Sequence, residues 1–183
     1  MVGGKIVRMK EDRPLWSADG NFVRLVENGA NSTVYEFSNH RGSFVLKELK
    51  ATAEIYAFVN DDPFSAARVL NRLYELVKKH YGEKMSDTMF IVARNRKGMP
   101  AVITVQEKVE GKPLSQVIKE GDGRMALAMH VKAEEYGDLW DEVVRDRGWK
   151  KLPSGVRKHY RKDDMHIDNI FLTPDGRFIV VDF

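Results

Sequence analysis

Residues 163–183 read DDMHIDNIFLTPDGRFIVVDF, and this stretch decides the fold that we expect for the chain. It contains two short apolar runs, at 170–172 and 178–181, and each is long enough for a β-strand. Between them stands TPDG at 173–176, whose residues are typical of a tight turn. The stretch therefore predicts a β-hairpin.

Three polar residues of this stretch stand where the hairpin begins and ends. Asp164 and Asn169 precede the first apolar run, and Asp182 follows the second. Because a hairpin returns its end close to its start, we expect Asp164, Asn169 and Asp182 to converge at one edge. Carboxylate and amide oxygens are hard ligands, suited to Mg²⁺ and to the chemistry of phosphates. The sequence thus predicts a set of three oxygen-bearing side chains at one edge of the hairpin.

The same residues resemble a known superfamily. The pattern D-x-x-x-x-N from Asp164 to Asn169, followed by an apolar hairpin and D-F, is similar to the catalytic loop and metal-binding end of protein-kinase-like enzymes. With His166 in the loop it resembles most the D-x-H-x-x-N of aminoglycoside phosphotransferases and other atypical, RIO-like kinases. The resemblance implies that Asp164 orients and deprotonates an acceptor hydroxyl, Asn169 holds a metal, and Asp182 holds the metal that bridges the phosphates.

The first half of the chain predicts a sheet and one strong helix. Alternating apolar residues and turn signals predict five antiparallel strands, at 22–26, 33–37, 44–49, 89–93 and 101–105. A helix is predicted to begin with Asp62 as its N-cap and Pro63 at its first position, and to stop at Gly82. We also expect a short helical segment at 51–60.

Candidate nucleotide-binding residues lie in this sheet. Gly29 and Ser32 stand in a turn that resembles the phosphate-covering loop of kinases, with Val34 at the position of that motif's Val. Lys47 matches the Lys of the V-A-I-K strand, which contacts phosphates in the family. Alternation along a strand puts Val45 and Lys47 on one face, an apolar wall for adenine beside a cation. In the family this Lys pairs with a helical Glu, and the candidates are Glu75, which we favour slightly, and Glu54.

Residues 106–114 resemble a kinase hinge, in which the extended backbone at Glu107 and Val109 would hydrogen-bond the adenine edge. The alternative is a simple loop between domains. Either interpretation places a boundary near residue 110, with an N-lobe at 1–110 and a partial C-lobe at 111–183.

The second lobe is expected to be mainly helical before its final hairpin. A short helix is predicted at 114–119 and a long one at about 124–147. The long helix is expected to form the core of this lobe through apolar residues on or near one face: Leu127, Val131, Leu139, Trp140, Val143 and Val144. The basic run at 157–162 is interpreted as a solvated stretch rather than a substrate or phosphate contact.

Composition narrows the class of protein. The chain has 183 residues, 30 Lys and Arg against 27 Asp and Glu, and a net charge of +3, which is too small to predict nucleic-acid binding. The absence of Cys excludes disulfides and a Cys nucleophile. No apolar run approaches the ~20 residues of a membrane span, and no signal-peptide core is present. We therefore expect a cytoplasmic protein with no membrane partner, although secretion without such a signal stays open.

Together these features predict an α+β, two-lobed, kinase-like fold. The predicted function is ATP- and Mg²⁺-dependent transfer of the γ-phosphoryl group to a hydroxyl of a protein or a small molecule. One alternative is a pseudokinase that binds nucleotide or protein without catalysis. Another is a metal-dependent hydrolase using Asp163, Asp164, His166 and Asp168. Because the chain stops at Phe183, we expect a fragment, a minimal kinase, or a kinase completed by an activating partner.

Overall fold

The computed structural model describes residues 7–8, 22–28, 32–39, 42–50, 53–95, 98–160 and 167–181, of which 7–8, 22–28 and 39 are described by their backbone only. The chain divides into two compact units. The first contains Met1–Asn71 and Asp87–Lys108, and the second contains Arg72–Ser86 and Val109–Phe183. The second unit therefore includes residues 72–86, which the predicted division at residue 110 assigns to the N-lobe.

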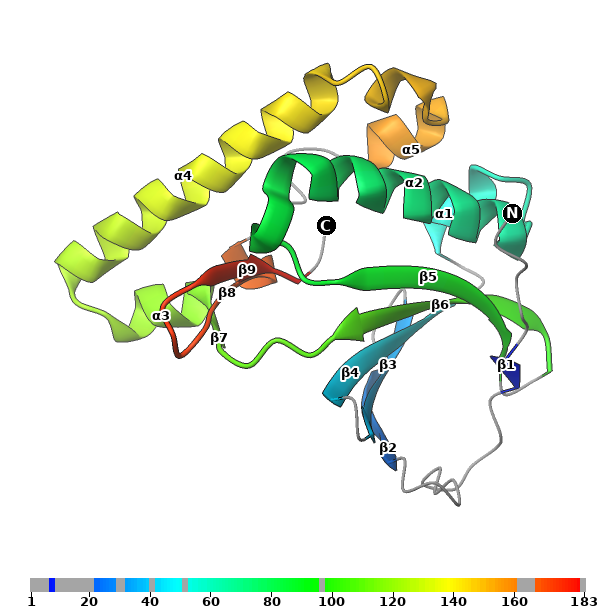
Figure 1. Cartoon of the computed structure of the whole chain (residues 1–183), viewed down its shortest axis with the longest axis horizontal. Coiled ribbons are helices and arrows are strands. Elements are labelled where there is room, and N and C mark those ends of the chain that lie inside the picture. Colours follow the sequence, from blue (N-terminus) through cyan, green and yellow to red (C-terminus); the bar gives the residue numbers. More distant parts are fainter. Residues whose placement is uncertain are drawn as a thin grey trace. The chain divides into compact units, whose positions relative to one another are not determined.

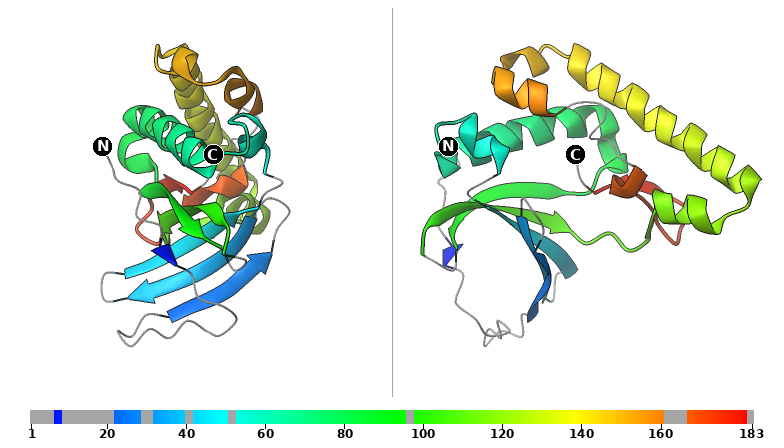
Figure 2. Two further views of the ribbon diagram at one scale, coloured as in Figure 1. Left: turned by 90° about the vertical axis from the view of Figure 1, so that its right-hand side faces the viewer. Right: turned by 180° about the vertical axis from the view of Figure 1, so that it is seen from behind.

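The first unit is built on a six-stranded sheet of order β1-β5-β6-β4-β3-β2 (Figure 1). Its strands are β1 (Val7–Arg8), β2 (Phe22–Asn28), β3 (Ser32–Asn39), β4 (Gly42–Leu49), β5 (Thr88–Arg94) and β6 (Pro100–Glu107). All neighbours are antiparallel except β1, which runs parallel to β5. Figure 2 shows β2, β3 and β4 side by side as the predicted meander. The five predicted strands correspond to β2–β6.

Two helices follow the meander along the chain. They are α1 (Glu54–Ala57) and α2 (Pro63–Tyr81), and α2 begins in the first unit and ends in the second. Asp62 caps α2 as predicted, because its carboxylate accepts the N–H groups of Phe64 at 3.2 Å and Ser65 at 3.0 Å. Hydrogen bonds from Ser65 lower the pKa of this carboxyl group.

The core of the first unit includes side chains from both faces of its sheet, because the neighbouring residues Val102 and Ile103 of β6 are both buried. Its buried residues come from α1, the start of α2 and the strands β3, β5 and β6: Tyr35, Ile55, Tyr56, Ala66, Leu70, Val92, Val102 and Ile103. Asn71 adds a polar clamp, since its side chain donates to the Phe90 carbonyl at 2.7 Å and accepts the Phe90 N–H at 3.2 Å. The amide side chain of Asn71 thus satisfies both the N–H and the carbonyl of Phe90.

The second unit is mainly helical and carries a small antiparallel sheet of order β7-β8-β9. Its elements are η1 (Gly82–Lys84), β7 (Lys112–Pro113), α3 (Leu114–Glu120), α4 (Gly123–Arg145), η2 (Trp149–Lys151), α5 (Ser154–His159), η4 (Ile167–Asn169), β8 (Ile170–Leu172) and β9 (Phe178–Val180). The predicted hairpin is confirmed as β8 and β9. The two-residue strand β7 was not predicted.

The packed face of α4 differs from the predicted one. Leu127 and Val131 are 67% and 52% exposed, whereas Tyr136 and Trp140 are buried. Each exposed residue precedes a buried one by nine positions, which is two and a half turns of helix and therefore the opposite side. The prediction was wrong for Leu127 and Val131, and also for Val144, which is 38% exposed, but right for Trp140 and Val143.

These elements confirm an α+β protein. Among the described residues, no helix is both long and apolar enough to cross a membrane.

Candidate functional site

The sheet of the first unit brings several candidate nucleotide-binding residues to one face. Strand register sets Val34 of β3 and Thr104 of β6 opposite Lys47 of β4. Val45 lies two residues before Lys47 on β4, so it shares this face, and Gln106 lies opposite Val45. Thr104 and Gln106 are buried polar side chains, at 7% and 6% exposure. Glu36 of β3 also lies opposite Val45, so the face combines two Val side chains, a Lys, a carboxylate and two buried hydrogen-bonding groups.

The candidate phosphate-covering loop is described only in part. Ser32 begins β3 and is half-buried. Gly29 lies outside the described residues. The pairing of β2 with β3 shifts register between Leu25 and Glu27, which is a β-bulge just before this loop. A bulge bends and twists its strand locally, so the loop leaves a distorted rather than a regular strand end.

The candidate hinge follows β6. The Glu107 N–H donates to the Asp87 carbonyl at 3.0 Å, and the Lys108 N–H donates to the Ser43 carbonyl at 2.9 Å. The N–H of Glu107 is therefore not available to an adenine edge. Val109 is half-buried and outside any strand, and within the described ranges its N–H makes no backbone hydrogen bond. The boundary between the two compact units falls between Lys108 and Val109.

The hairpin of the second unit brings Asn169 next to residue 181. Ile170 pairs with Val180 in the ladder, and the Val181 N–H donates to the Asn169 carbonyl at 2.8 Å. Asp182, the next residue along the chain, lies outside the described residues, as does Asp164. The backbone convergence expected from a hairpin is confirmed as far as Asn169 and Val181, while the convergence of the three side chains stays a prediction.

The turn that closes the hairpin is braced by its own residues. The Gly176 N–H donates to the Thr173 carbonyl at 2.9 Å, and Gly176 adopts a φ of +82°, which favours glycine. Asp175 accepts the Thr173 hydroxyl and, at 2.7 Å, the Arg177 Nε–H, and both contacts lower the pKa of its carboxyl group. The TPDG signal in the sequence accounts for this turn.

The segment that carries Asn169 is held by two contacts that the sequence did not predict. The Ser115 hydroxyl of α3 donates to the carboxylate of Asp168, the neighbour of Asn169. Strand β7 pairs with β8, and Gly111 just before it approaches so closely that a Cβ there would lie 2.5 Å from the Leu172 carbonyl oxygen. Ser115 and Asp168 are 53 positions apart, so no local pattern could have predicted their contact.

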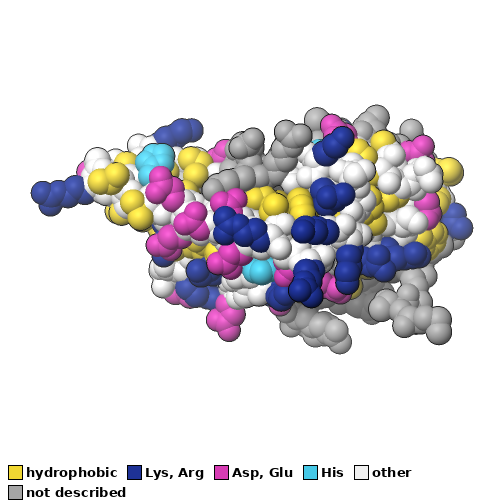
Figure 3. Space-filling model, turned by 90° about the horizontal axis from the view of Figure 1, so that it is seen from above, with side chains coloured by type: hydrophobic (Ala, Val, Ile, Leu, Met, Phe, Trp, Pro, Cys, Tyr) yellow, Lys and Arg dark blue, Asp and Glu magenta, His cyan; other side chains and the backbone are white. Residues whose placement is uncertain are grey.

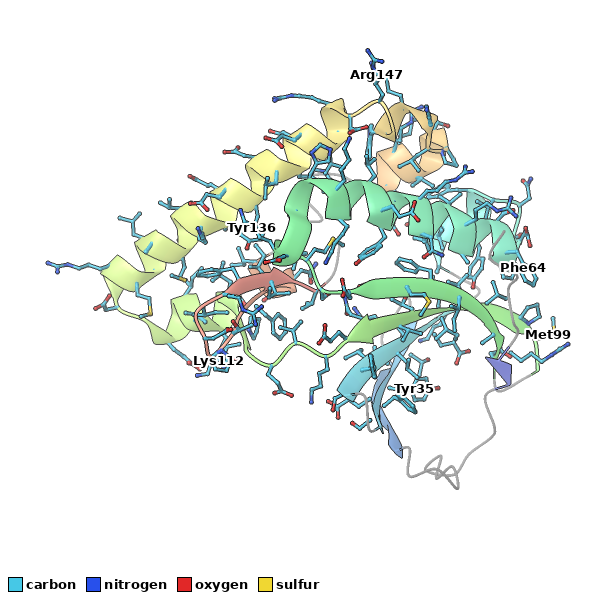
Figure 4. All side chains as sticks on the ribbon, in the orientation of Figure 1. Tyr35, Phe64, Met99, Lys112, Tyr136 and Arg147 are labelled. Carbon is cyan, nitrogen blue, oxygen red and sulfur yellow. The ribbon has the colours of Figure 1, made fainter. Side chains whose placement is uncertain are left out.

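Helix α4 is also joined to the hairpin by hydrogen bonds. The Tyr136 hydroxyl donates to the Phe178 carbonyl of β9 at 2.7 Å, and the Tyr81 hydroxyl at the end of α2 donates to the Tyr136 carbonyl at 2.6 Å. Figure 4 labels Tyr136 on the side of α4 that faces the end of α2. Burial raises the pKa of Tyr136 to about 12, so this donor stays protonated at neutral pH. The hairpin therefore rests on a hydrogen-bonded helical support.

The two candidate partners of Lys47 are both exposed carboxylates, Glu54 at the start of α1 and Glu75 in the middle of α2. Which of them pairs with Lys47 stays a prediction. Within the described ranges, no three His, Asp or Glu side chains gather in a way that could hold a metal ion. Of the four hydrolase candidates only Asp168 is described, and it is engaged by Ser115.

The chain matches no protein-family model and no curated protein sequence.

Proposed function

We propose that the chain is an ATP- and Mg²⁺-dependent phosphotransferase of the kinase type, which transfers the γ-phosphoryl group of ATP to a hydroxyl. The proposal rests above all on one observation, the hydrogen bond from the Val181 N–H to the Asn169 carbonyl at 2.8 Å. This bond sets Asn169 beside the residue that precedes Asp182. An Asn and an Asp at neighbouring positions are a fitting oxygen pair for Mg²⁺.

The face of the first unit's sheet supplies the second support. Val34 and Val45 offer apolar contact for a flat base, and Lys47 stands directly opposite Val34 in the register. A Lys is suited to hold phosphate as a point charge. The carbonyl of Glu107 and the N–H of Val109 are one acceptor and one donor, as the edge of adenine requires.

In this proposal each residue has a stated role. Asp164 accepts the proton of the acceptor hydroxyl, and Lys47 orients the phosphates. Asn169 and Asp182 would hold Mg²⁺, which when bound neutralises charge on the phosphates. Ser115 is a positioning residue, because its hydrogen bond to Asp168 fixes the segment next to Asn169. Catalysis of this kind depends mainly on positioning and electrostatics.

The test is calorimetric titration of the full chain with ATP, with and without Mg²⁺. We expect binding that strengthens with Mg²⁺. Lys47→Ala should weaken ATP binding about tenfold or more, because a charge-assisted contact to phosphate is lost. Asn169→Ala should remove most of the dependence on Mg²⁺ while the chain still binds ATP.

Lys50→Ala is the matched control, since Lys50 lies three positions from Lys47 and is also half-buried. It should bind ATP as the parent chain does. Equal losses in Lys47→Ala and Lys50→Ala, or no ATP binding by the parent chain, would contradict the proposal. Mg²⁺-dependent phosphoryl transfer that disappears in Asp164→Ala would establish the enzyme. Mg²⁺-dependent binding without any transfer would instead identify the pseudokinase alternative.

A further inference from the structure

The segment at 145–158 concentrates positive charge far beyond the chain average. It holds three Arg, three Lys and a single carboxylate, Asp146, which gives it a net charge of +5. The whole chain has a net charge of only +3, so the remaining residues together are slightly acidic. The positive potential is therefore local, and whole-chain charge underestimates it.

The single carboxylate of this segment is already occupied. Asp146 accepts Lys79 Nζ at 2.6 Å, the Gly148 N–H at 2.7 Å and His80 Nε2 at 3.1 Å. These contacts, that of Lys79 foremost, hold the pKa of Asp146 well below its usual range. The carboxylate therefore stays ionised. Its contacts are with Lys79 and His80 of α2 and not with the Arg and Lys side chains of its own segment.

Four cations of the segment remain uncompensated at the surface. Arg145, Arg147, Lys150 and Lys151 are all exposed, and no ion pair joins any of them to a carboxylate of the described residues. We call these four side chains the basic surface. Figure 4 shows Arg147 pointing away from the ribbon. Figure 3, a view from above, shows many Lys and Arg side chains on that face of the molecule, interspersed with Asp and Glu side chains.

The backbone beneath the basic surface is firmly packed. Trp149, Leu152 and Val156 are buried at 6%, 6% and 0% exposure. The ring of Trp149 meets the buried ring of Trp140 edge to face, at 5.7 Å between centroids. The four cations thus project from well-packed backbone. Binding a ligand there costs less conformational entropy than binding it to a flexible tail would.

We propose that the basic surface binds the phosphate backbone of nucleic acid, without reading base sequence. Four uncompensated cations on a fixed frame suit a polymer that carries a negative charge at every residue, and Arg can grip phosphate with two N–H groups. The proposal rests on local charge, since the net charge of +3 is by itself too small to predict this partner. It is independent of the proposed phosphotransferase activity.

The apolar side chains of the segment argue against an anionic membrane as the partner. Peripheral helices that bind membranes insert exposed apolar residues beside their cations. Here the large apolar residues between 145 and 158 are Trp149, Leu152 and Val156, and all three are buried. The segment also contains no Asn or Gln, which often read base edges, and its one aromatic ring is not available for stacking on bases.

The test is fluorescence anisotropy with a labelled single-stranded oligonucleotide of mixed sequence and with a labelled duplex, over a series of salt concentrations. We expect binding to both that weakens steeply with salt. Lys150→Glu/Lys151→Glu should lower the affinity about tenfold or more and reduce the slope of log K against log salt by about 1.5, since each phosphate contact contributes about 0.7 to 0.9. Scrambling the base sequence should leave the affinity unchanged.

Lys119→Glu/Arg124→Glu is the control, because it changes the net charge equally at two exposed positions of the same unit. It should bind like the parent chain. Equal losses in both double variants would overturn the proposal, because net charge alone would then explain the binding. So would the absence of any binding at low salt, or a preference for vesicles with anionic lipids over nucleic acid. Circular dichroism establishes that each variant is folded, and Lys150→Gln/Lys151→Gln gives a milder test if the Glu variant is not.

Discussion

At the scale of single residues, three hydrogen bonds converge on the carboxylate of Asp146 in the second unit. It accepts hydrogen bonds from Lys79 and His80 of α2 and from the Gly148 N–H, and so joins the end of α2 to the segment that follows α4. We expect Asp146→Asn to lower the urea midpoint of unfolding at neutral pH. The reason is that the amide keeps the shape of the side chain but loses its charge toward Lys79 and presents N–H groups where an acceptor is needed.

The pH dependence of this effect has a definite sign. The folded-state pKa of Asp146 is lowered from its ordinary value of 3.8, so the stabilisation is complete above that value and is lost as the pH falls toward the folded-state pKa. The difference in urea midpoint between the parent chain and Asp146→Asn should therefore shrink as the pH falls below about 4. Asp138→Asn, at an exposed position of α4, is the control and should show little difference at any pH. A difference that grows on acidification would contradict this account.

At the scale of elements, the pairing of β7 with β8 depends on a single glycine. A Cβ at Gly111 would lie 2.5 Å from the Leu172 carbonyl oxygen, a distance that real Cβ atoms do not tolerate. Because the obstacle is backbone, β8 would have to move. We expect Gly111→Ala to lower the free energy of unfolding by about 1 to 3 kcal/mol, as overpacking usually does.

Gly123→Ala provides the comparison for this prediction. Gly123 is the first residue of α4, and a Cβ there meets no neighbour within 4 Å. The substitution should be neutral or stabilise the protein by up to about 1 kcal/mol, since Ala is the better helix former. Both values come from chemical denaturation followed by circular dichroism. Equal effects of Gly111→Ala and Gly123→Ala would show that the approach of β7 to β8 is looser than described.

Elements also show which patterns could be predicted from sequence. The hairpin β8–β9 and the N-cap of α2 depend on residues a few positions apart, TPDG at 173–176 and Asp62 with Ser65, so local chemistry predicts them. The face of α4 depends on what packs against it. Apolar residues stand on opposite sides of that helix. Contacts with α2 and the hairpin select Tyr136, and the contact with Trp149 of η2 selects Trp140, over Leu127 and Val131.

The candidate site likewise contains some features that the sequence could predict and others that it could not. Alternation along β4 predicts that Val45 shares a face with Lys47, because that is a property of any strand. Which strand lies on each side of β4 is set by tertiary structure, and thus the sequence could not indicate that Thr104 and Gln106 join this face from β6. The support of Asp168 by Ser115 is a long-range contact of the same kind.

At the scale of the whole molecule, charge is distributed unevenly, and this should cost stability. The basic surface gathers Arg145, Arg147, Lys150 and Lys151 without carboxylate partners among the described residues, although the chain as a whole is close to neutral. Like charges held together by a fold repel one another, and salt screens that repulsion within about 10 Å at 0.1 M.

This cost can be measured without any ligand. We expect Lys150→Gln/Lys151→Gln to raise the melting temperature at low salt by about 2 °C, because two repulsive contributions of a few tenths of a kcal/mol are removed. The gain should disappear as salt is raised toward 0.5 M, where the parent chain is already screened. Lys119→Gln/Arg124→Gln, outside the basic surface, should give no gain. Two outcomes would contradict this account: a lower melting temperature in Lys150→Gln/Lys151→Gln, or a gain that salt does not alter. Either would mean that these two Lys residues stabilise the fold through packing. The charge repulsion would then no longer support a ligand-binding role for the basic surface.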